Sequence, residues 1–271
     1  QYVLLNKQSH SVIAFDKYKE ILEDIIDHIV KLRVESEAKK PKKSNSRKQK
    51  KGKWIPPQLT HLKREGKDHR HGHNVTGDDF MKCFGIRGGE FGNWTNDHDR
   101  QVNLNMAFDA FCDMADALNI SRRDIGLIGL ETGALAIAFG ARGRSGALAH
   151  YEPEREVINL TKMKGAGSLA HEWGHALDLY VARTYNMDSL MATEASFLES
   201  RQGKVPFKEL MHTMKYNGNE KTEYYKNAEK LDQTFSKTDQ GYWRSDVELF
   251  ARAFASYAVS YTHLTLPTNS R

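Results

Sequence analysis

The stretch "GAGSLAHEWGHALDLY", residues 165–180, holds three side chains with the spacing of a metal site. His171 and His175 lie four residues apart, and Glu172 follows the first of them. Residues four apart on a helix share one face, so both imidazoles can reach a single Zn²⁺. A carboxylate between them can take a proton from water in the open position of the metal. The spacing predicts one zinc ion and hydrolytic chemistry, with Glu172 as the catalytic residue.

A catalytic zinc needs a third protein ligand, and the sequence offers two acidic candidates. Six residues after the second histidine, where some zinc peptidases carry a third one, the chain has Val181. Asp178 lies one turn after His175 and is better suited to orienting an imidazole than to binding the metal. Glu248 interrupts an apolar helical stripe in "SDVELFARAFASYA", and we expect it to be the third ligand. The alternative is a surface ion pair between Glu248 and Arg252, one turn further along.

Two residues upstream of the zinc motif are candidates for contact with the substrate. His150 and Tyr151 lie in the strand-like segment "ALAHYEP". Either side chain could donate a hydrogen bond to an oxyanion that develops during hydrolysis. The alternative for both residues is a structural role.

A second group of histidines lies in the loop "DHRHGHN". His69, His71 and His73 alternate there and could hold a second metal ion. Alternating histidines in a loop that contains glycine are more often solvated, so solvent exposure is the favoured interpretation.

The zinc motif must lie on a helix, and its neighbours predict one. Leu169, Trp173 and Leu177 recur at helical spacing and form an apolar face opposite the histidine pair. Ser168 is a plausible N-cap for this helix. The strand-like segment 157–161 precedes the helix, and we expect it to be the sheet edge along which an extended peptide binds.

The rest of the chain alternates between helical and strand-like patterns. Apolar residues at helical spacing predict a helix within "NLNMAFDAFCDMADALNI", and "ALAIAFGARG", "ALAHYEP" and "EVINLTK" predict successive short strands. A polar stretch with few periodic apolar positions, roughly 200–240, precedes the last helix. These elements predict an α+β fold with a short mixed sheet.

Composition divides the 271 residues into four parts. Residues 1–37 predict a strand pair and a helix, either a domain fragment or a cap on the main domain. Residues 38–59 form a basic linker, residues 60–258 are globular in composition, and residues 259–271 contain "VSYTHLTLPT". That last segment resembles a translated sequencing-library adapter, so we interpret 259–271 as an artefact without functional weight.

The positive charge is concentrated in the linker. Residues 38–53 carry nine Lys or Arg, and subtracting them from the formal net charge of +5 leaves −4 on the remainder. The segment could contact nucleic acid weakly, but it lacks the aromatic residues that stack on bases. The glycines of "RGGEFGNW" do not have the spacing of a nucleotide-binding loop. We expect no membrane association, because apolar runs are short, and two cysteines indicate a reducing compartment.

Several long motifs resemble one protein family. "VTGDDFMKCFGIRGGEFGNW", "DRQVNLNMAFDAFCDMADALNI", "HYEPEREVINLTKMKGAGSLAHEWGHALD" and "ELFARAF" are together similar to the first type of large polyvalent protein-associated domain. The resemblance covers roughly residues 60–258 and implies a zincin-like metallopeptidase domain within a larger multi-domain protein of phages and mobile genetic elements. It implies His171, Glu172, His175 and Glu248 as site residues. "HEWGHALD" also resembles the active helix of lethal-factor-type toxins, which favours a gluzincin arrangement by analogy.

These observations lead to two hypotheses. The first is a zincin-like hydrolase of the gluzincin type that binds one Zn²⁺, cleaves protein or peptide substrates and acts in the cytoplasm of a bacterial host cell. The second is a non-catalytic zincin scaffold that binds partners and contacts DNA through residues 38–53.

Overall fold

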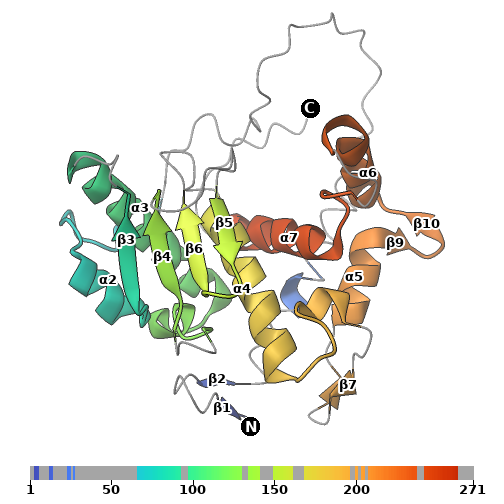
Figure 1. The fold of residues 1–271 in the computed structure, drawn as a ribbon, viewed down its shortest axis with the longest axis horizontal. Helices are drawn as coiled ribbons and strands as arrows, with labels where there is room; N and C mark the ends of the chain where they lie inside the picture. The colour runs from blue at the N-terminus through green and yellow to red at the C-terminus, as the bar shows by residue number, and fades with distance from the viewer. Residues whose placement is uncertain are drawn as a thin grey trace, which may run out of the picture.

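The computed structural model describes residues 3–5, 12–14, 23–25, 27, 66–92, 97–129, 134–140, 149–160, 168–195, 199–200, 203–204, 207–236 and 241–261. Within them the chain is an α+β fold in which helices pack against a small mixed sheet. Figure 1 shows two crossing helices, α4 (Leu169–Thr184) and α7 (Asp246–Tyr261), between that sheet and the pair α5 (Phe207–Lys215) and α6 (Glu223–Phe235). None of the described helices is both long enough and apolar enough to cross a membrane.

The sheet has four strands in the order β3-β4-β6-β5. The strands are β3 (Gly88–Phe91), β4 (Ala136–Phe139), β5 (Ala149–Glu152) and β6 (Val157–Leu160). β3, β4 and β6 run parallel, whereas β5 pairs with β6 in the antiparallel direction. The strands predicted within 134–161 and the mixed character of the sheet are therefore confirmed.

The predicted edge strand, however, is wrong. Residues Val157–Leu160 pair with β4 on one side and with β5 on the other, and all four are buried. A strand that is paired on both sides has no free row of backbone N–H and C=O groups to offer a peptide. β5, which is half-buried along its whole length, lies at this edge of the sheet instead.

Helices α4 and α7 cross at Gly174, between the two histidines of the zinc motif. A Cβ atom at Gly174 would lie 3.2 Å from Cδ1 of Phe254 and 3.4 Å from Cα of Ala251. The Trp173 ring stacks on Phe254 with centroids 5.3 Å apart, and its indole N–H donates to the Ile125 carbonyl at 2.9 Å. The apolar face predicted for α4 is thus buried, and the glycine lets α7 come close to the histidine pair.

Replacing Gly174 with valine is expected to destabilise the fold by about 1–3 kcal/mol, because the added methyl groups must displace Phe254 or the backbone of α7. Thermal unfolding measures the loss of stability. Gly77→Val is the matched control, because nothing lies within 4 Å of a Cβ at Gly77. Equal unfolding temperatures of the two variants would contradict a close helix crossing.

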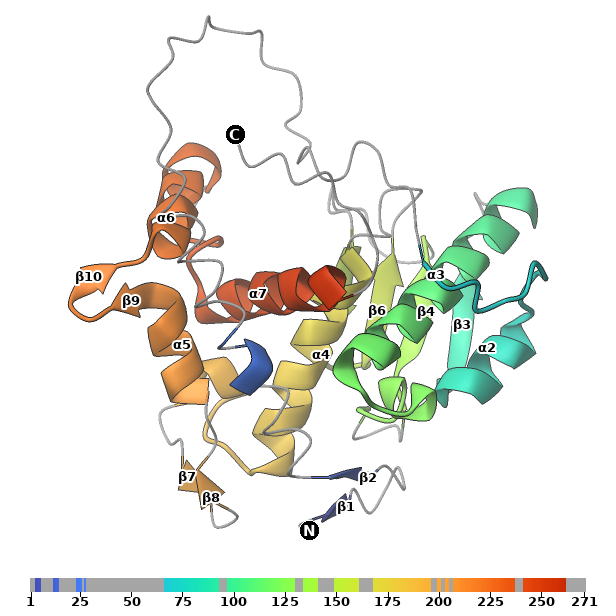
Figure 2. The same ribbon diagram turned by 180° about the vertical axis from the view of Figure 1, so that it is seen from behind.

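A second packing layer covers the sheet and supports α4. Figure 2 shows α3 (Asp97–Leu118), the predicted helix of this region, lying across the sheet strands. It packs with α2 (Gly77–Phe84) and the short 3₁₀ helix η2 (Arg122–Ile125). Phe80 and Phe84 of α2 meet Phe108 and Phe111 of α3 with ring centroids 5.1–6.2 Å apart. This aromatic cluster forms the end of the core that lies beside β3.

The polar stretch predicted at roughly 200–240 is largely helical. Its described elements are the strand pair β7 (Glu199–Ser200) and β8 (Gly203–Lys204), α5, the hairpin β9 (Tyr216–Asn217) and β10 (Glu220–Lys221), and α6. The apolar stripe of α5 is narrow, and all four of its members are buried: Phe207, Leu210, Met211 and Met214. A few apolar residues therefore suffice to pack α5 against α7.

The N-terminal strand pair is confirmed, because β1 (Val3–Leu5) and β2 (Val12–Ala14) pair antiparallel. Further along, residues 23–25 and 27 are helical, and Ile25 is fully buried in the main core. The Tyr257 hydroxyl of α7 donates to the Asp24 carboxylate at 3.2 Å. The helical part of this unit thus packs on the main domain as a cap, whereas the linker 38–59 and residues 262–271 lie outside the described residues.

Candidate metal centre and cleft

Three predicted ligands from two helices meet where α4 and α7 cross. Nε2 of His171 lies 3.1 Å from Nε2 of His175. One oxygen of Glu248 lies 3.4 Å from Nε2 of His171, and the other lies 3.5 Å from Nε2 of His175. Among the described residues, this is the one group of three His, Cys, Asp or Glu side chains placed to hold a metal ion.

The spacing of these atoms can be compared with that of a tetrahedral zinc site. Four ligand atoms arranged around zinc at ~2.0–2.1 Å stand ~3.3 Å from one another. The histidine nitrogens, 3.1 Å apart, lie close to that value, whereas the separations of 3.4 and 3.5 Å involve two different oxygens of Glu248 rather than one shared ligand atom. Two imidazoles and a carboxylate from a second helix are also a donor set that zinc accepts, and they leave the fourth position for water.

Two of the three side chains have the charge state that metal binding requires, whereas burial of His175 is outweighed by its contacts with Glu248, which raise the pKa of that imidazole and favour its protonated form. Burial alone would raise the pKa of the Glu248 carboxyl, but its contacts with His171 and His175 outweigh burial and hold the pKa well below its ordinary value. Burial lowers the pKa of His171 and favours its neutral form. Metal ligands must be deprotonated, so an ionised Glu248 and a neutral imidazole are the required species.

Glu172 lies beside the ligands but is not one of them. The residue is buried, with 5 % of its surface exposed, and it lines the same cleft as His175 and Glu248. Burial raises the pKa of Glu172 to about 7, and the nearby His175 opposes this rise. A carboxyl group with a pKa near neutrality can both accept and donate a proton, as a general base and acid must.

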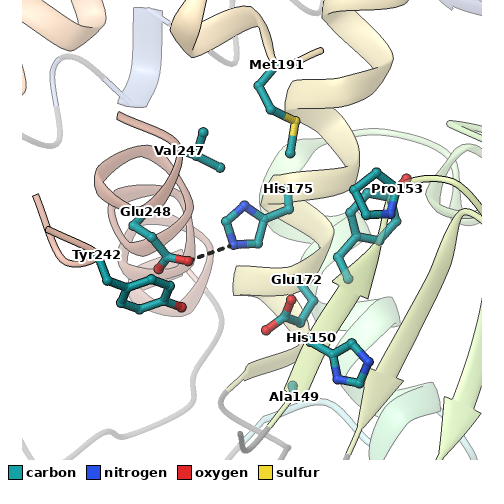
Figure 3. A pocket seen from close by; sticks show the side chains of 10 residues that line it. Ala149, His150, Pro153, Glu172, His175, Met191, Tyr242, Val247 and Glu248 are labelled. Carbon is teal, nitrogen blue, oxygen red and sulfur yellow. Dashed lines mark ion pairs between the residues drawn. The ribbon is translucent and has the colours of Figure 1, made fainter. Parts of the chain in front are cut away.

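The cleft has a volume of about 270 Å³. The protein surrounds it on three sides: the edge strand β5 and the turn after it, helix α4, and the start of α7 with the loop before it (Figure 3). The lining residues are Ala149, His150, Tyr151, Pro153, Glu172, His175, Met191, Tyr242, Val247 and Glu248. Apolar and polar side chains thus line the cleft together, and the polar ones include two of the three candidate metal ligands, His175 and Glu248.

His150 and Tyr151, the predicted oxyanion candidates, both line this cleft. His150 Nε2 lies 3.4 Å from a carboxylate oxygen of Glu152, so the imidazole is already engaged within β5. Burial raises the pKa of the Tyr151 phenol, and the charge of Glu156 raises it further. The tyrosine is therefore protonated, and its position on the edge strand suits contact with a bound peptide.

Asp178 does not orient an imidazole in this structure. Its two carboxylate oxygens accept hydrogen bonds from the backbone N–H of Thr193 at 2.9 Å and from the Thr193 hydroxyl at 2.7 Å. Nδ1 of His175 is buried and has no hydrogen-bond partner among the described residues. The fully buried Asp178 instead fixes the 3₁₀ helix η4 (Ala192–Glu194), next to Met191 in the cleft wall.

The surface ion pair considered for Glu248 and Arg252 is not formed. Arg252 donates from Nη2 to the Trp243 carbonyl, and its guanidinium lies 5.3 Å from the centroid of the Trp243 ring and 5.8 Å from that of Tyr224. The arginine therefore ties the loop before α7 to the helix, while Glu248 turns toward the histidines.

The sequence analysis missed Tyr242, which lies beside Glu248 at the mouth of the cleft (Figure 3). Partial burial of its phenol raises the pKa, and the charge of the Glu248 carboxylate and a hydrogen bond to it raise the pKa further, so the hydroxyl is a hydrogen-bond donor. The only sequence signal for Tyr242 is its position shortly before the last helix. Because the chain has 11 tyrosines, that signal does not distinguish Tyr242 from the others.

The three histidines of the 69–73 loop do not form a second metal group. His69 is buried, with Nε2 2.7 Å from Asp113 and Nδ1 3.2 Å from Arg122. His71 and His73 are exposed, as the solvated interpretation predicts. His69 thus joins the loop to α3 and η2.

Comparisons with models of known protein families, with curated proteins and with solved structures find no match for this chain.

Proposed function

We propose that this chain is a zinc-dependent peptidase-like domain of the gluzincin type. The observation that carries the proposal is the mutual spacing of Nε2 of His171, Nε2 of His175 and the Glu248 carboxylate, at 3.1–3.5 Å. A buried carboxyl group, Glu172, lies next to these atoms in an open cleft. Together they supply the ligands and the general base that metal-assisted hydrolysis requires.

Each residue has a separate task in the proposed reaction. His171, His175 and Glu248 would hold the ion, and bound zinc would act as a Lewis acid that acidifies water and polarises a carbonyl group. Glu172 takes the proton of the attacking water on its carboxylate and passes it to the nitrogen of the leaving amine. The Tyr242 hydroxyl donates a hydrogen bond to the oxygen that becomes negative, because it faces the cleft beside the ligands.

The substrate we propose is an extended protein or peptide segment bound along β5. This strand lies at the edge of the described sheet and contributes Ala149, His150 and Tyr151 to the cleft. A peptide that adds to a sheet edge gains main-chain hydrogen bonds regardless of its sequence. The apolar cleft residues, among them Met191 and Val247, then contact its side chains.

The biological setting is part of the same proposal. The motifs quoted above resemble those of phage and mobile-element polyvalent proteins, which supports a role inside a bacterial host cell as one domain of a longer polypeptide. The alternative, a non-catalytic binding module that contacts DNA, depends on residues 38–53, which lie outside the described residues.

Metal analysis of the purified chain tests the proposal most directly. We expect about one zinc per chain in the wild type and none in His171→Ala. Removing the metal with a chelator should lower the unfolding temperature by about 10 °C, because zinc present at ~1,000 times its Kd contributes ~4 kcal/mol and joins two core helices. Zinc absent from both proteins, or equally abundant in both, would rule out this metal centre.

A further inference from the structure

The carboxylate of Asp232, near the end of α6, binds three consecutive backbone N–H groups of another segment. Its Oδ1 accepts from Tyr242 and Trp243 at 2.7 Å each, and its Oδ2 accepts from Arg244 at 2.9 Å. The residue is buried, with 7 % of its surface exposed. A buried carboxylate is tolerated only when it is hydrogen-bonded, and here the bonds come almost entirely from one turn.

Gly241 shows how closely this turn fits around the carboxylate. The glycine has a φ of +74°, and a Cβ atom there would lie 2.6 Å from Oδ2 of Asp232 and 2.7 Å from Nε of Arg244. No larger residue fits without displacing the carboxylate or the turn. Gly241 therefore lies directly against the carboxylate of Asp232.

The turn held by Asp232 is the one that carries Tyr242 to the cleft. Tyr242 has 53 % of its surface exposed, so the side chains that pack against its ring hold the residue only partly in place. Its backbone N–H is bound by Asp232, and the next residue, Trp243, is bound by both Asp232 and Arg252. Backbone contacts outside the cleft therefore act on the position of the phenol, together with its contacts with Glu248 and the Trp243 ring.

We propose that Asp232 is the positioning residue for Tyr242: it fixes the 241–245 turn so that the phenol hydroxyl stays in the cleft beside Glu248. Asp232 itself is not a lining residue of the cleft and acts only through the turn. The effect of Asp232 on catalysis rests on the proposed function, whereas its effect on the position of the turn and of Tyr242 does not. Separate experiments test these two effects.

Amide hydrogen exchange of the metal-free protein tests the structural part. In Asp232→Ala, the amides of Tyr242, Trp243 and Arg244 should lose at least about tenfold in protection, because each loses a hydrogen bond to a charged acceptor. In Asp232→Asn, the amide oxygen can replace Oδ1, so the loss should be confined to Arg244. Asp79→Ala, which removes the capping carboxylate of α2, is the control and should leave all three unchanged. Unchanged protection of the turn in Asp232→Ala would overturn the proposal.

A fluorine label tests whether the phenol is placed in the cleft. With 3-fluorotyrosine at position 242, adding zinc should shift the fluorine resonance in the wild type and in Asp79→Ala, and should shift it much less in Asp232→Ala. An equal zinc response with and without Asp232 would overturn the positioning role even if exchange increased. Neither measurement needs cleavage activity, and amide exchange does not need zinc either, so the exchange measurement remains decisive even if the chain binds no zinc.

Kinetics then test the catalytic consequence on a random peptide mixture. Tyr242→Phe should lower kcat by about 10-fold or more with little change in KM, as expected when one oxyanion donor is removed. Asp232→Ala should lower kcat similarly, and the double variant should be no worse than Tyr242→Phe. Additive losses would show that Asp232 acts by another route and would overturn the proposal.

Discussion

Replacing Glu172 with glutamine is expected to slow peptide cleavage by a factor of about 10²–10⁴ while zinc stays bound. Glutamine keeps the size of the side chain but cannot take up the proton of the attacking water. The ligands His171, His175 and Glu248 are untouched, so the metal content should remain at one ion per chain. Loss of turnover without loss of metal is the outcome that distinguishes a peptidase from a zinc-binding scaffold.

The measurement is the rate at which a random peptide mixture is cut, followed by mass spectrometry, together with zinc analysis of the same samples. Glu194→Gln is the matched control, because Glu194 is an exposed acid in η4 close to the cleft wall. It should cleave and bind zinc like the wild type. If Glu172→Gln cuts the mixture as fast as the wild type, Glu172 is not the general base and the proposed mechanism is wrong.

The ligand set could be proposed from the sequence because its signals are local. His171 and His175 are one helical turn apart, and Glu248 is an acid inside an otherwise apolar stripe, which indicates a buried charge that needs a partner. Gly174 is a further local signal for the helix crossing, because a glycine between the histidines indicates the close approach of another backbone. The structure shows that approach at Ala251 and Phe254.

The surroundings of the site are only partly encoded in local patterns. The segment "VINL" of β6 is nearly all apolar, which is typical of a central strand, whereas "AHYE" of β5 alternates in polarity as an edge strand does. This difference indicates the observed strand order, so the prediction of 157–161 as the edge was wrong although a local signal for β5 exists. The backbone of Tyr242 is hydrogen-bonded to Asp232, ten residues earlier in the chain, and loop contacts of this kind have no periodicity to detect.

The role of Asp178 was also mispredicted for a physical reason. Helical spacing places it one turn after His175, but spacing does not say which partner a buried carboxylate finds. Thr193 offers it both a backbone N–H and a hydroxyl, and these two bonds satisfy the carboxylate more fully than one imidazole would. The result is a stronger connection between α4 and the cleft wall at Met191.

Replacing Glu248 with glutamine is expected to weaken zinc binding by at least about 100-fold, more than the loss of an outer contact to a metal ligand typically causes. An amide oxygen is a poor zinc ligand, and the variant removes the negative charge that offsets the ion beside two neutral imidazoles. Competition with a zinc-binding dye measures the affinity. The metal-free variant should also unfold at a lower temperature than the metal-free wild type, because glutamine cannot form the ion pairs that Glu248 makes with His171 and His175.

Two acidic residues provide the controls for Glu248, and they make the experiment decisive. Asp246 lies on the same helix but pairs with Lys215, so Asp246→Asn should bind zinc like the wild type. Asp178 was the other acidic candidate near the histidines, and Asp178→Asn should keep zinc while loosening the link to Thr193. If Glu248→Gln retained zinc and Asp178→Asn lost it, the third ligand would come from α4 alone, and the crossing of α4 and α7 would have no part in metal binding. The spacing of 3.4 and 3.5 Å between Glu248 and the two histidines favours the opposite result.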